Sequence, residues 1–208
     1  MNYLGHLYLT NGDYSLMTAN LYGDFVKGKK FSHLPEVVKQ GVILHREIDF
    51  FIDNHPEVIK LKQKLYKSLP KVSGIAIDLF FDHLLAKNWS DYSKINLSDF
   101  IEPFFKYSLN PHNLSFENPV FHYADEFIYL LQIMYEKEWI YQYQQIDGLK
   151  MASTGLSNRI PYPNELGKAV LVFTHLENEI TQVFKGFMFD AQEKFLSNQH
   201  SVDKLINL

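Results

Sequence analysis

The stretch Gly41-Val42-Ile43-Leu44-His45-Arg46-Glu47-Ile48-Asp49-Phe50-Phe51-Ile52-Asp53 decides how this sequence folds. Apolar side chains recur in and just before it at the spacing of one helical face; these positions are Val38, Val42, Ile48 and Ile52. The pattern predicts an amphipathic helix that begins at Pro35, where proline suits the first turn, and ends at about Asp53.

Two polar residues, His45 and Asp49, interrupt the apolar face of this helix. They are four residues apart, so their side chains project side by side toward whatever packs on that face. A carboxylate on a buried stripe is unfavourable unless a partner neutralises it. A metal ion is one partner that would do so.

The remainder of the chain has the same helical character. We expect helices at 2–10, 14–27, 56–69, 74–89, 97–107, 118–135, 138–153 and 164–195, with a loop at 155–163 that contains Arg159. We expect Asn118 to be the N-cap of the helix at 118–135 and Pro119 to lie in its first turn. Internal repeats and convincing runs of alternating strand residues are absent from the sequence. The prediction is an all-α fold with a single helical domain over residues 1–208.

Composition limits the classes of function. The 208 residues are 46% hydrophobic and 21% charged, which is typical of one globular domain with a substantial core. The lack of cysteine excludes disulfides and thiolate metal sites. A net charge of −4 argues against nucleic-acid binding, and neither a signal peptide nor a membrane span is evident. We expect a cytoplasmic protein without nucleic-acid or membrane partners; the sequence does not indicate its oligomeric state.

Further polar residues lie on helices that otherwise form the core, all of them in the first 90 positions: His6, Asn20, Asp24, Asp78, Asp82 and His83. Taken singly, a core histidine is more often just hydrogen-bonded, so the prediction depends on their concentration. Imidazole and carboxylate donors suit Mn, Fe, Mg or Zn. Such a site leaves positions for water, which favours hydrolysis. Spacing leaves open which of the aspartates are ligands.

At these residues the sequence resembles the acyl carrier protein phosphodiesterase (acyl carrier protein hydrolase) family, which is similar to a non-standard branch of the HD phosphohydrolases. The matching segments are MNYLGHL at 1–7, ANLYGDFVKG at 19–28, HREID at 45–49, DNHPE at 53–57, FDHLLAKNW at 81–89 and, more weakly, GLSNR at 155–159. An ordinary HD signature has histidine followed by aspartate, whereas this chain has Asp82 followed by His83. The ligand set is therefore not copied from ordinary HD enzymes.

The resemblance implies an HD-like helical bundle and a metal-dependent phosphodiesterase. Its reaction would be hydrolysis of the phosphodiester that links 4′-phosphopantetheine to the serine of holo acyl carrier protein, giving the apo protein and free 4′-phosphopantetheine. The implied cofactor is a divalent metal, Mn²⁺ first, with Mg²⁺ or Fe²⁺ as alternatives. We hypothesise that Asp24, His45, Asp82 and His83 hold the ion, which activates a water molecule.

Three further residues receive roles in this hypothesis. Asp49 orients a ligand histidine or accepts the proton of the water, and Arg46 stabilises charge on the phosphoryl oxygens. His6 protonates the departing serine oxygen. The carrier protein is expected to be acidic, and a group of lysines just after Asp24 would dock it: Lys27, Lys29 and Lys30.

Two other functions remain open at this stage. The same metal centre would serve a hydrolase of nucleotides or other small phosphoesters, which assays with both substrates would separate. A helical protein that binds the carrier protein without cleaving it would contain no metal after purification.

Overall fold

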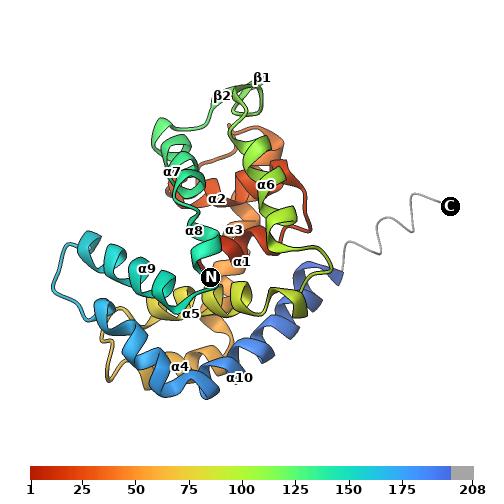
Figure 1. The fold of residues 1–208 in the computed structure, drawn as a ribbon. Helices are drawn as coiled ribbons and strands as arrows, with labels where there is room; N and C mark the ends of the chain where they lie inside the picture. The colour runs from red at the N-terminus through yellow and green to blue at the C-terminus, as the bar shows by residue number, and fades with distance from the viewer. Residues whose placement is uncertain (198–208) are drawn as a thin grey trace.

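In the computed structural model, which describes residues 1–197, nearly all regular structure is helical (Figure 1). The α-helices are α1 (Tyr3–Tyr8), α2 (Tyr14–Leu21), α3 (Glu36–Asn54), α4 (Pro56–Leu65), α5 (Ser73–Lys87), α6 (Leu97–Ser108), α7 (Asp125–Glu136), α8 (Trp139–Gln142), α9 (Ile146–Arg159) and α10 (Ala169–Phe195). The 3₁₀ turns are η1 (Tyr22–Phe25), η2 (Trp89–Asp91), η3 (Pro111–Asn113) and η4 (Leu166–Lys168). A small antiparallel ribbon pairs β1 (Ser115–Glu117) with β2 (Val120–His122).

The apolar face predicted for α3 is the face that the protein buries. Val38, Val42 and Ile48 are fully buried, and Ile52 nearly so. This face packs on α2 and on η1. The helices approach closely at Gly41, where an added Cβ would lie 2.3 Å from the Cβ of Ala19. The α2–α3 contact brings the polar residues of both helices to one place.

Helix α5 is the central element of the other half of the core. It contacts α1, α4, α9 and α10, and its buried residues include Phe80 and Phe81. Helix α10 runs along one edge of the molecule in Figure 1, and the N-terminus lies close to α8 and α9. The buried apolar residues form one continuous cluster, so the described residues confirm the all-α prediction and form one helical body.

The segment 115–122 differs from the expectation. Asn118 and Pro119 form the turn of the β1–β2 ribbon instead of opening a helix, and α7 begins only at Asp125. The ribbon is stabilised by the cross-strand contact of Phe116 with Phe121, whose ring centroids lie 5.9 Å apart. Strands of three residues are too short to produce a readable alternation in the sequence.

The helix expected at 138–153 is divided into α8 and α9. Gly148 packs directly against the end of α8, where an added Cβ would lie 1.9 Å from the carbonyl oxygen of Gln142. Helix α9 then continues to Arg159, so this residue ends a helix and does not lie in the predicted loop. The helix expected from residue 14 to 27 stops at Leu21 and continues only as η1.

No helix in residues 1–197 is long and apolar enough to cross a bilayer.

Candidate metal centre

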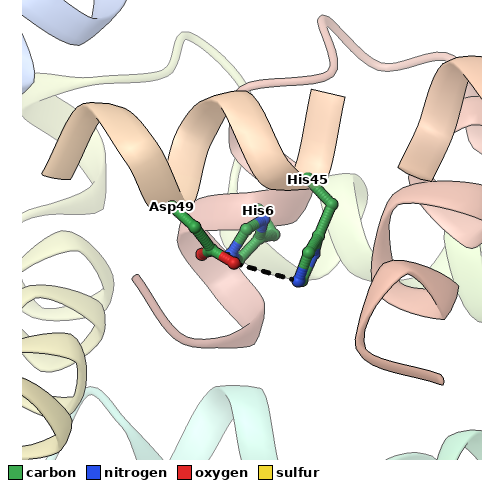
Figure 2. Close-up of side chains that lie close together, drawn as sticks. All are labelled: His6, His45 and Asp49. Atoms are coloured by element: carbon green, nitrogen blue, oxygen red, sulfur yellow. Dashed lines mark ion pairs between the residues drawn. The ribbon is translucent and has the colours of Figure 1, made fainter. Parts of the chain in front are cut away.

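Three donor groups from two helices converge on one point. His6 comes from α1, and His45 and Asp49 project from the same side of α3 toward it (Figure 2). Asp49 Oδ1 lies 3.2 Å from His6 Nε2, and Asp49 Oδ2 lies 3.2 Å from His45 Nε2. One possible ligand atom from each residue lies within 4.8 Å of the others, close enough to share a single cation.

Asp24 adds a fourth donor from the turn η1. Its Oδ1 lies 3.3 Å from His45 Nε2. The preceding residue, Gly23, lies flat against the imidazole of His45, where an added Cβ would come within 2.4 Å of the ring. Both histidines are buried, but 66% of the Asp24 side chain and 47% of the Asp49 side chain remain accessible to solvent. The cluster therefore has a protected imidazole side and an open carboxylate side.

A single amide fixes the orientation of both imidazoles. Asn20 Oδ1 lies 3.0 Å from His6 Nδ1 and 3.3 Å from His45 Nδ1, while Asn20 Nδ2 donates to the carbonyl oxygen of His6 at 3.2 Å. The amide oxygen can only accept, so both Nδ1 atoms are the protonated donors. In the neutral rings, both Nε2 lone pairs then face the carboxylates.

This arrangement fits a divalent cation. An imidazole lone pair that faces a carboxylate oxygen is repelled unless a proton or a metal ion lies between them. Two imidazole nitrogens, held in place by an outer amide, and two carboxylates are donors of the type that Mn²⁺, Fe²⁺ and Zn²⁺ accept. The fit depends on His6, His45, Asp24 and Asp49 together.

The protonation states also suit a metal site. Burial lowers the pKa of His6, which keeps this ring neutral. The contact with His45 lowers the pKa of Asp24. Burial alone would raise the pKa of Asp49, but the contact with His6 and the charges nearby hold it below the ordinary value. Neutral imidazole beside ionised carboxylate is the form that binds metal.

The structure does not bring Asp82 into this cluster, so the candidate donors differ from the expected ligand set. Asp82 is fully buried, and its two oxygens accept from the backbone N–H groups of Leu4 at 2.8 Å and Gly5 at 3.0 Å. It caps the start of α1 and so positions the helix that carries His6. Asp78 is also elsewhere, with Oδ1 3.0 Å from the amino group of Met1.

His83, the other expected ligand on α5, is likewise directed away. Its Nδ1 lies 2.7 Å from the carbonyl oxygen of Tyr143, and its ring packs edge-on against Phe173 at 5.1 Å. A helix that is apolar on nearly every side does not reveal which neighbour each polar residue faces. This is why spacing alone could not separate His83 from the donor cluster.

Arg46 has a different place from the one expected. Its Nη2 donates to the carbonyl oxygens of Val26 at 2.9 Å and Gly28 at 2.7 Å, and its guanidinium lies over the Phe31 ring at 4.8 Å. Arg46 thus ties the segment that follows η1 to α3. This segment carries the three exposed lysines, of which Lys27 donates from Nζ to the backbone oxygen of Asp24 at 2.6 Å.

Asn20 is the residue whose role the sequence did not define. The available signal was its position four residues before Asp24 on an otherwise apolar face. That spacing marks it as unusual but says nothing about which groups it contacts, because both of its imidazole partners come from other helices.

The fold and the cluster define an all-α protein with a candidate centre for a divalent cation. The chain belongs to the acyl carrier protein phosphodiesterase family, whose model matches residues 1–191. The acyl carrier protein phosphodiesterase of Enterobacter sp. (strain 638) is 28% identical over 201 residues, which cover 94% of this chain and 100% of that protein. The protein of the same name from Salmonella agona (strain SL483) is 29% identical over 163 residues, 77% of this chain and 80% of its own length.

The chain matches no solved structure. The similarity to HD phosphohydrolases therefore stays a prediction.

Proposed function

We propose that this protein hydrolyses the phosphodiester between 4′-phosphopantetheine and the serine of holo acyl carrier protein, releasing the apo protein and 4′-phosphopantetheine. One observation carries the proposal: in a member of this family, the donor atoms of His6, His45 and Asp49 converge, and the exposed carboxylate of Asp24 lies beside His45. A phosphodiester presented by a folded protein needs such an accessible site, and the open carboxylate side provides one.

His6, His45, Asp24 and Asp49 are the residues that would hold the divalent ion, Mn²⁺ first, with Mg²⁺ or Fe²⁺ as alternatives. When bound there, such an ion supplies a water of lowered pKa and attracts the charge of the phosphate. His6 suits the role of donor better than that of general acid, because burial favours its neutral form. Asp49 is half-exposed and its pKa is held below the ordinary value, so in this proposal the carboxylate oxygen that does not hold the ion would accept the proton of the water.

Docking of the carrier protein is assigned to the exposed lysines beside the centre. The segment that carries Lys27, Lys29 and Lys30 begins next to Asp24 and is held by Arg46. An acidic partner attracted to these lysines would bring its modified serine to the carboxylate side of the centre. Arg46 therefore supports docking through the lysine segment instead of contacting the phosphate.

The test is incubation of the purified protein with holo acyl carrier protein, with added Mn²⁺ or with a chelator, followed by the mass of the carrier protein. We expect loss of the phosphopantetheine mass only with metal. His45→Ala should abolish the loss, whereas His112→Ala, an exposed residue on η3, should not. Full cleavage by His45→Ala, or by the metal-free protein, would contradict the proposal. Cleavage of nucleotides without cleavage of the carrier protein would favour the small-phosphoester function.

A further inference from the structure

A slot opens between the start of α1 and the pair α8–α9, where Figure 1 places the N-terminus. Its volume is about 150 Å³, room for on the order of ten water-sized groups. The walls are largely apolar, with Trp139, Met151 and Leu156 among them, and the polar groups at its edge include Gln142 and Arg159. Small-molecule sites have this combination of apolar walls with a few polar groups.

Tyr3 connects the slot to the helix that carries His6. Tyr3 lines the slot and precedes His6 by one helical turn on α1. Burial, followed by the carboxylate of Asp24, raises the pKa of the Tyr3 hydroxyl, while the guanidinium of Arg159 acts in the opposite direction. Tyr3 and Arg159 both line the slot, so the slot extends from the guanidinium to the helix that carries His6.

Two glycines of α9 shape the slot. Gly148 allows the helix to approach the carbonyl of Gln142, which closes one end. At Gly155 an added Cβ would meet only Arg159, whose Nη2 lies 4.0 Å away. Arg159 is held there because its Nε donates to the carbonyl oxygen of Gly155 at 3.3 Å. The guanidinium thus lies over a glycine that keeps the slot open.

We propose that this slot binds the pantetheine arm of the substrate, with Arg159 contacting the phosphate end. The inference rests on the proposed function for the identity of the ligand. The arm joins short alkyl segments by amides, which suits apolar walls with polar groups at the edge. Its phosphate would lie between the guanidinium and the carboxylate side of the centre. The slot holds the part of the arm next to the phosphate, and the remainder extends toward solvent.

The test compares two glycines with open space around their Cβ positions. Gly155→Leu places a side chain in the slot, whereas Gly186→Leu adds the same side chain on the exposed surface of α10. Both positions are inside helices, where leucine has the higher propensity, so both variants should fold. Calorimetric titration with 4′-phosphopantetheine and with pantetheine measures binding directly, and turnover of holo acyl carrier protein gives kcat/KM.

We expect Gly155→Leu to weaken 4′-phosphopantetheine binding and to lower kcat/KM by about tenfold or more, with Gly186→Leu unchanged. Arg159→Gln should weaken binding of 4′-phosphopantetheine but not of pantetheine, which has no phosphate. If Gly155→Leu and wild type bound 4′-phosphopantetheine with equal affinity, or if wild type did not bind it, the assignment of the slot as the binding site would be overturned. Slot-dependent binding without cleavage of the carrier protein would instead overturn the proposed function and leave the slot in place.

Discussion

The imidazole rings of His6 and His45 stack with their centroids 4.2 Å apart and their planes inclined by 19°. Burial, and to a lesser extent the neighbouring His45 ring, lowers the pKa of His6, so a positive charge on His6 is disfavoured. The neutral form of each ring leaves a lone pair for a metal ion. The stack therefore links the packing of α1 on α3 to the chemistry of the centre.

The ligand set revised by the structure can be tested against the one that the sequence suggested. His6→Gln and Asp49→Asn should each lower the affinity for Mn²⁺ by about tenfold or more, because each removes a donor that belongs only to the structure-based set. His83→Gln should leave the affinity within about twofold, since His83 contacts Tyr143 and Phe173 instead. Metal titration followed by elemental analysis measures both. Loss of metal from His83→Gln alone would restore the original assignment.

Asn20 should be required for metal affinity although it is not a ligand. Asn20→Leu removes the oxygen that accepts from both Nδ1 atoms, so the rings lose their fixed tautomer and orientation. We expect Mn²⁺ affinity to fall roughly 10- to 100-fold, the usual range for such outer partners. Asn20→Asp keeps an acceptor and should retain more affinity than the leucine variant. Equal affinities for wild type and Asn20→Leu would show that Asn20 has no orienting role.

Asp82 should contribute to stability in a pH-dependent way. Burial raises its pKa to about 7, although the Met1 amino group and the Leu4 and Gly5 N–H groups act in the opposite direction. The folded chain then holds a proton that the unfolded chain releases near its model value of 3.8. This stabilising contribution is complete below the unfolded pKa and is lost as pH rises through about 7.

The stability advantage of wild type over Asp82→Asn should therefore be larger at about pH 5 than at about pH 8. Urea unfolding of the metal-free wild type and variant at both pH values measures this difference in the free energy of unfolding. The titration of other groups largely cancels when the two proteins are compared. The substitution should cost roughly 1–3 kcal/mol at the lower pH, because an amide NH₂ faces a backbone N–H. A difference that does not change with pH would mean that Asp82 does not titrate in this range.

Arg46 should affect recognition of the carrier protein more than the chemical step. Arg46→Met keeps contact with Phe31 but removes both hydrogen bonds to the lysine segment. We expect KM for holo acyl carrier protein to rise about three- to tenfold with little change in kcat. Lys29→Glu should act in the same direction, and Lys67→Glu, an exposed lysine outside this segment, should not. A large fall in kcat for Arg46→Met would instead support the role first expected for Arg46, stabilising charge on the phosphoryl oxygens.

Much of the fold could be predicted because amphipathic periodicity survives in the sequence. The periodicity predicts the buried face of α3 at Val38, Val42, Ile48 and Ile52, which is confirmed. Of the two polar residues expected on that face, His45 is buried and Asp49 is half-exposed. Where a helix is interrupted by a tight contact, as at Gly148, or where strands are very short, the periodic signal is lost. These are the places where the expected elements differ from the observed ones.

The sequence by itself determined an all-α chain whose core helices carry acids and imidazoles, because helical spacing fixes which residues share a face. Only the tertiary structure decided which of them share a centre. His6, Asp24 and His45 lie on α1, η1 and α3, and they meet because α2 packs on α3 while Asp82 holds the start of α1. Helical periodicity tells which side of one helix a side chain lies on. A binding site also requires that several helices pack so that their donors meet at one point.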